Sequence, residues 1–260
     1  MTLDKIYQED CIETLKKLDD NSIDLIITSP PYNKGYWSKN RNPRNGFHTK
    51  SRRIDYGVYD DCMPPEEYER WQRDVLDECI RVIKPEGSIW YNHKEILSGR
   101  NAINPTYIYD YPLVQTIIWN RKNTPVLDKR YFFPTTEWLY WIKKDKSAKP
   151  FFDKGQAIYK NVIWEIAPDV KNNHPAPFPI EIPENIILSC SRPGDVVYDP
   201  FMGSGTVAIA AKTHDRHYLG SELSPEYVED AEQRIKEETT PPPGEEIISV
   251  KNTLLNIEKQ

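Results

Sequence analysis

Short apolar runs alternate with amphipathic stretches along most of the chain. The apolar runs predict strands at 24–28, 88–91, 116–119, 138–142, 195–198 and 218–222. Apolar positions at helical spacing predict helices over 66–83, 182–190, 206–214 and 225–236. Strands that alternate with helices are typical of a mostly parallel sheet covered on both faces. The pattern therefore predicts a doubly wound α/β fold.

Composition limits the class of protein. The 260 residues are 38% hydrophobic, enough for one large core, and no apolar run is long enough to span a membrane. The N-terminus lacks the pattern of a signal peptide, and the four cysteines show neither CxxC spacing nor a secreted framework. We expect a cytoplasmic protein with reduced thiols and no metal site. Residues 1–238 are expected to form the catalytic domain, and 239–260 a linker and C-terminal appendage.

A glycine-containing turn follows the strand predicted at 195–198. Its sequence is Asp199-Pro200-Phe201-Met202-Gly203-Ser204-Gly205-Thr206. Glycines let the backbone approach a ligand, and the first turn of a helix offers free N–H groups. The third glycine of the dinucleotide fingerprint and the end of a P-loop are both absent, so a compact nucleoside fits better than a diphosphate. S-adenosylmethionine is the expected cofactor, with its ammonium at Asp199 and its ribose at Glu222.

Two prolines end the strand predicted at 24–28. They belong to the sequence Thr28-Ser29-Pro30-Pro31-Tyr32. The rigid backbone can aim the Pro30 carbonyl at a substrate amine, Ser29 supplies a second acceptor, and Tyr32 can stack on a base. If two acceptors bind the hydrogens of a conjugated amine, they pull its nitrogen towards tetrahedral geometry and free the nitrogen lone pair. The predicted catalytic residues are thus Ser29, Pro30, Pro31 and Tyr32.

The two motifs, in this order, resemble those of the DNA amino-methyltransferases in which the catalytic motif precedes the cofactor motif. Glu9-Asp10-Cys11 resembles the family's turn whose acid meets the cofactor adenine, and 173–179 resembles the segment beside the methionine part. The resemblance covers about residues 5–236. It implies a seven-stranded sheet with one antiparallel strand and a target base flipped out of the duplex. The implied cofactor residues are Asp10, Cys11, His174, Pro175, Ala176, Asp199, Phe201, Gly203, Ser204, Gly205, Thr206, Glu222 and Leu223.

Basic residues gather in two stretches, although the net charge is −6. The first stretch predicts contacts to DNA phosphates from Lys34, Lys39, Arg41, Arg44, Lys50, Arg52 and Arg53. The second lies within 143–171 and mixes lysines with aromatic residues. We interpret regions 33–60 and 143–172 as DNA-contacting insertions. Duplex DNA is the expected partner and a restriction endonuclease a candidate companion, while monomer and homodimer both remain open.

The residue before Pro-Pro-Tyr bears on the target atom. In the family, serine at this place goes mostly with cytosine N4 and aspartate mostly with adenine N6, so Ser29 favours cytosine and leaves adenine as the alternative.

Other reactive or aromatic residues are interpreted as structural. Cys190 lacks the surroundings of a thiolate nucleophile, His93 is interpreted as a structural histidine, and the aromatic residues of Trp138–Trp141 are interpreted as core. A methyltransferase for RNA or protein, and a binding module without catalysis, are less favoured by the intact motifs and the basic stretches.

Overall fold

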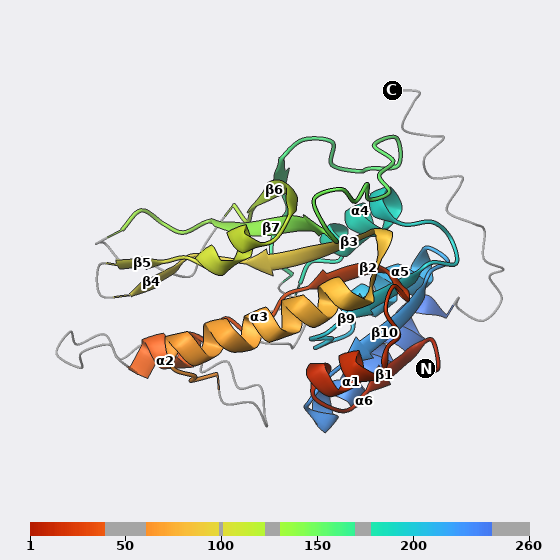
Figure 1. The fold of residues 1–260 in the computed structure, drawn as a ribbon, viewed down its shortest axis with the longest axis horizontal. Coiled ribbons are helices and arrows are strands. Elements are labelled where there is room, and N and C mark those ends of the chain that lie inside the picture. The colour runs from red at the N-terminus through yellow and green to blue at the C-terminus, as the bar shows by residue number, and fades with distance from the viewer. Residues whose placement is uncertain (40–60, 99–100, 123–130, 170–177, 241–260) are drawn as a thin grey trace.

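A computed structural model describes residues 1–39, 61–98, 101–122, 131–169 and 178–240 (Figure 1). Within these ranges the main sheet has eight strands, in the order β1-β10-β9-β2-β3-β7-β6-β8. Their bounds are β1 (Lys5–Tyr7), β2 (Ile23–Thr28), β3 (Ile83–His93), β6 (Leu113–Asn120), β7 (Thr136–Lys143), β8 (Ile163–Glu165), β9 (Val196–Asp199) and β10 (His217–Ser221). Neighbouring strands run parallel except where β7 pairs with β3 and β6. The ribbon of β4 (Ile96–Ser98) and β5 (Asn101–Ile103) stands apart.

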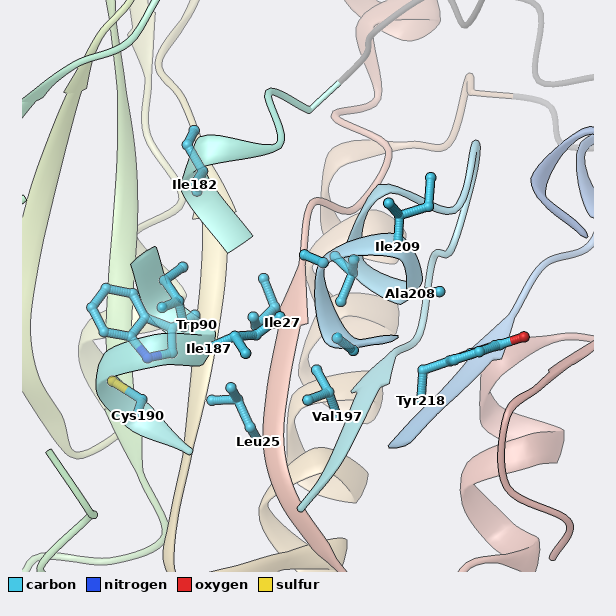
Figure 2. Close-up of a cluster of buried hydrophobic side chains, with 14 of the residues drawn as sticks. Leu25, Ile27, Trp90, Ile182, Ile187, Cys190, Val197, Ala208, Ile209 and Tyr218 are labelled. Carbon is cyan, nitrogen blue, oxygen red and sulfur yellow. The ribbon is translucent and has the colours of Figure 1, made fainter. Parts of the chain in front are cut away.

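Helices cover both faces of this sheet. The long α3 (Pro65–Val82) and α1 (Cys11–Lys17) pack on one face, and α4 (Glu181–Cys190), α5 (Thr206–Thr213) and α6 (Pro225–Thr239) pack on the other (Figure 1). Successive side chains of β2 point to the two faces in turn. Leu25 and Ile27 pack on the α4 and α5 side (Figure 2), whereas Ile26 packs on the side of α1 and α3. The doubly wound α/β prediction is confirmed.

The sheet has one strand more than the seven that were expected. The additional strand is β8, which pairs in parallel with β6 inside the stretch interpreted as a DNA-contacting insertion. Trp164 of this strand is 3% exposed and stacks on Trp90, and Ile166 just after it is also buried. Apolar burial therefore makes this part of 143–172 a piece of the core.

Lys144 also departs from the DNA-contact interpretation. Its Nζ donates to the backbone carbonyls of Ile80, Arg81 and Ile83, at distances of 2.7 to 3.0 Å. These carbonyls belong to the end of α3 and its exit, where unpaired acceptors favour a cation. Lys143 pairs with Ser88 in the middle of β3, five residues before His93 at the carboxyl end of the strand. This lysine pair stabilises the fold at the edge opposite the predicted catalytic motif.

The chain reverses its winding between β2 and β9. From β2 it leads through α3 to β3 on one side, and from β9 through α5 to β10 on the other, so the following helices cover opposite faces. In open α/β sheets, ligands bind outside the carboxyl ends of the strands at such a switch point. The expected binding place thus lies between Ser29 and Asp199.

No helix in the described ranges is both long and apolar enough to cross a membrane. All four cysteines are free thiols; Cys11, Cys79 and Cys190 are buried and Cys62 is partly exposed.

Candidate active site

A single pocket brings both predicted motifs together at the carboxyl ends of β1, β2, β9 and β10. Trp71 of α3, Phe178 and Tyr227 of α6 contribute further walls. The predicted residues that line the pocket are Asp10, Cys11, Ser29, Pro30, Pro31, Tyr32, Asp199, Phe201, Gly203, Ser204, Thr206, Glu222 and Leu223. The parallel register of the sheet produces this meeting, because strand ends far apart in sequence share one edge.

Asp199 joins the two motifs at the switch point. Its Oδ1 accepts hydrogen bonds from Thr28 Oγ1 at 2.9 Å and from the Phe201 backbone N–H at 3.0 Å. Burial, with a smaller contribution from the nearby charge of Glu222, raises the pKa of Asp199 to about 7, although these two donors act in the opposite direction. A carboxylate in such surroundings is suited to a cationic ligand group, which would restore a partner for its charge.

Glu222 follows β10 on the same wall. Its Oε2 accepts from the Gly203 backbone N–H and its Oε1 from that of Ser224, both at 2.9 Å. Burial raises the pKa of Glu222, and these amides partly offset the effect. The two N–H donors fix the carboxylate in orientation while its remaining lone pairs can accept from hydroxyls. This is the position predicted for a ribose contact.

Apolar groups complete the cofactor side. The rings of Trp71 and Phe201 meet edge to face with centroids 5.5 Å apart, and Leu223 is 39% exposed beside them. The carboxylates of Asp199 and Glu222, together with aromatic walls in the same pocket, fit a zwitterionic nucleoside such as S-adenosylmethionine.

Asp10 has a structural role besides lining the pocket. Its side chain caps α1 by accepting from the Ile12 N–H at 2.8 Å. Cys11 beside it is 3% exposed, and burial raises the pKa of its thiol. The thiol is therefore a small apolar wall and no nucleophile.

Gly205, which is predicted to contact the cofactor, is not among the residues that line the pocket, and its packing role is clearer. It has φ of +80°, and a Cβ at this position would lie 3.1 Å from Ala231 Cβ of α6. Its hydrogen atom therefore makes room for α6 packing on α5 and for the left-handed turn that begins α5. Gly203, whose N–H binds Glu222, is the glycine of this motif that faces the cofactor side.

A pair of substitutions separates these two demands on Gly205. Gly194 also has positive φ, of +84°, but a Cβ there would have nothing within 4 Å. Gly194→Ala is expected to cost about 1 kcal/mol from backbone strain alone, whereas Gly205→Ala should cost about 2–3 kcal/mol because overpacking adds to the strain. Urea unfolding measures both, and equal losses would contradict the packing role.

The catalytic motif lies in a tightly held turn. Asn33, directly after it, has φ of +56° and clamps Met63 with two hydrogen bonds of 2.7 and 2.8 Å. Tyr68 of α3 donates to the Pro31 carbonyl at 2.9 Å. Among the described residues no donor reaches the Pro30 carbonyl. This carbonyl and Ser29 Oγ are thus the acceptors that the motif presents to a substrate.

Tyr32 is surrounded by aromatic and charged groups and is only 6% exposed. The ring of His93 lies 4.8 Å from its own, and burial lowers the pKa of His93 to about 4, so this histidine is neutral. The ammonium groups of Lys34 and Lys94 each lie 5.2 Å from the centre of the Tyr32 ring. The buried His93 packs against the ring of Tyr32, the predicted catalytic residue.

A polar network that no sequence pattern indicates lies behind Tyr32. The Tyr32 hydroxyl contacts Ser29 Oγ at 2.9 Å, Glu137 Oε2 at 3.2 Å and Asn92 Oδ1. Glu137, 5% exposed, accepts from Arg121 Nη1 at 2.7 Å and from Lys94 Nζ at 3.2 Å. Because β7 is antiparallel, its first residues lie at the same edge as the last residues of β3 and β6. The topology thus adds Glu137, Arg121 and Lys94 to the site.

Some predicted residues lie outside the described ranges: His174, Pro175, Ala176, Arg41, Arg44, Lys50, Arg52 and Arg53. Lys34 and Lys39 lie in the short α2 (Lys34–Lys39), which begins the first basic stretch, and Lys34 approaches Tyr32 as described above. No cluster of possible metal ligands occurs in the parts of the chain that the structure covers.

Residues 23–233 match the model of the N6/N4 DNA methylase family. This chain belongs to that family. The type II methyltransferase M.BglII of Bacillus subtilis is 30% identical over 91% of this chain and 70% of its own length. The fold of PvuII DNA methyltransferase, described as cytosine-N4-specific, superposes with a TM-score of 0.71 at 20% identity, over 98% of this chain and 94% of that one. A complex of M1.HpyAVI with S-adenosylmethionine gives a TM-score of 0.59 at 25% identity, over 89% and 98%.

Proposed function

We propose that this DNA methylase transfers a methyl group from S-adenosylmethionine to the exocyclic N4 of a cytosine flipped out of duplex DNA. The observation that carries the proposal is the pairing of two neutral acceptors, Ser29 Oγ and the Pro30 carbonyl, beside a stacking ring in the pocket that also holds Asp199 and Glu222.

The cofactor supplies an electrophilic methyl group on a sulfonium. Of the residues that line the pocket, Asp199 would hold the cofactor ammonium, Glu222 would accept from the ribose hydroxyls, and Asp10 would face the adenine. On the other side, Tyr32 stacks on the target base while Ser29 and the Pro30 carbonyl accept from its amine hydrogens. These two hydrogen bonds oppose delocalisation of the amine lone pair into the ring and orient it for in-line attack.

Serine at position 29 favours cytosine over adenine. Cytosine presents O2 and an unprotonated N3 beside its amine, so a carboxylate near this edge would repel it, whereas a hydroxyl can donate or accept. Lys94, which lies over the Tyr32 ring, adds positive charge next to the same edge, whereas burial and the charge of Lys94 lower the pKa of Lys34 to about 7. Adenine N6 is the alternative target, with the same mechanism.

A stacked base cannot bring its amine to the cofactor, so the base must leave the duplex. The first basic stretch follows Tyr32 directly in the sequence, so we expect it to contact phosphates beside the flipped nucleotide. Contacts from Lys39, Arg41, Arg44, Lys50, Arg52 and Arg53 remain part of the proposal, as does a catalytic domain spanning 1–238 with an appendage at 239–260. A companion endonuclease and the choice between monomer and homodimer stay predictions.

Nucleoside analysis tests the target atom. Duplex DNA is incubated with the purified protein and S-adenosylmethionine, digested, and separated by mass spectrometry; RNA and protein substrates run in parallel. We expect N4-methyldeoxycytidine from DNA and no methylated RNA or protein. N6-methyldeoxyadenosine as the sole product would overturn the cytosine assignment and leave the family, the cofactor and the mechanism standing.

A further inference from the structure

We infer that Glu137, which lies outside the pocket, promotes methyl transfer as a positioning residue that acts through Tyr32 and Ser29. It strengthens the hydrogen bond between Ser29 and the target amine, and it receives the proton that the amine gives up. The inference rests on the proposed amine methylation, and it holds for either target base.

Three side chains form a continuous path away from the substrate. Ser29 Oγ lies 2.9 Å from the Tyr32 hydroxyl, which lies 3.2 Å from Glu137 Oε2. Ser29 and Tyr32 line the pocket, whereas Glu137 is buried and does not. The path therefore begins where the amine would bind and ends at a carboxylate that no substrate group can touch.

Glu137 is the group of this network that can hold a proton. Asn92 Oδ1 also lies near both hydroxyls, 3.1 Å from Ser29 Oγ, but an amide oxygen does not take up a proton at neutral pH. Asn92 Nδ2 donates to the Trp138 carbonyl at 3.1 Å, which fixes the orientation of the amide. Of the other buried carboxylates, Asp199 contacts Thr28 and belongs to the cofactor side, and Asp61 accepts from the backbone N–H groups of Lys34 and Gly35.

Neighbouring cations keep Glu137 ionised. Burial alone would raise its pKa, but the charges of Lys94, Arg121 and Lys34 outweigh burial and lower it. Lys94 and Arg121 directly follow β3 and β6, and Lys34 lies in α2, where burial lowers its pKa to about 7. The neighbouring His93 is neutral, because burial lowers its pKa to about 4. Because hydrogen bonds in a chain polarise one another, a charged acceptor at the end makes Ser29 Oγ a stronger acceptor for the amine.

The proton balance is simple. The amine lone pair forms the new N–C bond, and the electron pair of the broken C–S bond stays on sulfur. The methylated amine is then a cation and loses one proton to Ser29 Oγ, while the Ser29 hydroxyl proton passes to Tyr32 and that of Tyr32 to Glu137. Both hydroxyls end as they began, and the neutral Glu137 acid, with its low pKa, returns the proton to solvent before the next turnover.

A double-mutant cycle tests the path. Glu137→Gln keeps the shape and an acceptor for Tyr32 but cannot take up a proton, and Tyr32→Phe keeps the ring but removes the hydroxyl. Each change is expected to lower the single-turnover rate of methyl transfer by about 100-fold, with cofactor affinity and KM for DNA nearly unchanged. Because both interrupt one path, the double variant should be no slower than the slower single variant.

Glu165→Gln is the matched control. Glu165 lies on β8, is 62% exposed at its side chain and pairs with Lys122 at 3.5 Å, so the same chemical change should leave the rate unaltered. Normal rates in folded Glu137→Gln and Tyr32→Phe, or rate losses that multiply in the double variant, would overturn the inference. If Glu137→Gln does not fold, Tyr32→Phe decides alone, because a normal rate in this variant overturns the inference. Failure of the wild-type protein to methylate an amine in DNA would instead overturn the proposed function.

Discussion

Replacing Tyr32 by alanine is expected to lower methyl transfer by about 1,000-fold, the largest loss from any single change in the site. Base stacking on an aromatic side chain contributes about 1–3 kcal/mol, and misplacing a reacting group by about 1 Å costs about 100-fold more. Both effects act here, because the Tyr32 ring would stack on the base and its hydroxyl is tied to Ser29, which would bind the amine. Cofactor affinity should change little, since the cofactor contacts lie on the Asp199 side.

Single-turnover kinetics with saturating DNA measures the loss, and calorimetry measures cofactor binding. Removing a ring that is only 6% exposed also leaves a cavity, so a control must suffer the same packing loss away from the pocket. Tyr140 of β7 is 1% exposed and does not line the pocket. Tyr140→Ala should destabilise the protein comparably while its folded fraction keeps a normal rate. A Tyr32→Ala rate within tenfold of wild type would show that Tyr32 is ordinary core.

Local sequence pattern was sufficient for most of the fold. The strand predicted at 24–28 is β2, and the helix predicted over 66–83 is α3, within one residue at each end. These elements carry clear signals: continuous apolar residues ended by Pro30 and Pro31, and an amphipathic repeat begun by Pro65. The short β8 was missed because three residues that include one buried tryptophan give no periodicity.

The cofactor wall was predictable because contiguous motifs carry it. Glu137 was not, because its role comes from pairing between distant strands. In the sequence it is one charged residue before an apolar run, and nothing nearby shows that Arg121, Lys94 and Tyr32 surround it. The register that sets Glu137 opposite Trp119 creates this neighbourhood. Gly205 is the opposite case. Its motif can be recognised in the sequence, but only the packing shows that the absence of a side chain at Gly205 makes room for Ala231.

Cofactor affinity is expected to rise with pH up to about pH 7 and then to level off. Asp199 has a pKa raised to about 7 by burial, so it is mostly protonated at pH 6 in the free protein. A cationic ammonium favours the ionised form, so binding below pH 7 must release a proton. Linkage then predicts a Kd that falls by up to about tenfold per pH unit below pH 7 and stays constant above it. Glu222, whose pKa is also raised, adds to the slope in the same direction.

Asp199→Asn should remove the Asp199 part of this dependence, because the amide still accepts from Thr28 but carries no charge. At pH 8 the variant should bind S-adenosylmethionine about 100-fold more weakly, the loss expected when one partner of a buried charge pair is removed. At pH 5.5 the difference should shrink below about tenfold, since Asp199 is then neutral in the wild-type protein too.

The free energy of unfolding should change with pH in the opposite sense. Because the folded pKa of Asp199 is above its unfolded value of 3.8, the stability of the wild-type protein falls as pH rises towards 7, and the Asp199→Asn variant does not show this loss. Titration calorimetry in buffers of different ionisation enthalpy measures affinity and proton release together, and Asp110→Asn, on an exposed carboxylate paired with Arg73, is the matched control. A wild-type affinity that is flat from pH 5.5 to 8, or a slope that Asp199→Asn leaves unchanged, would show that the cofactor cation does not meet Asp199.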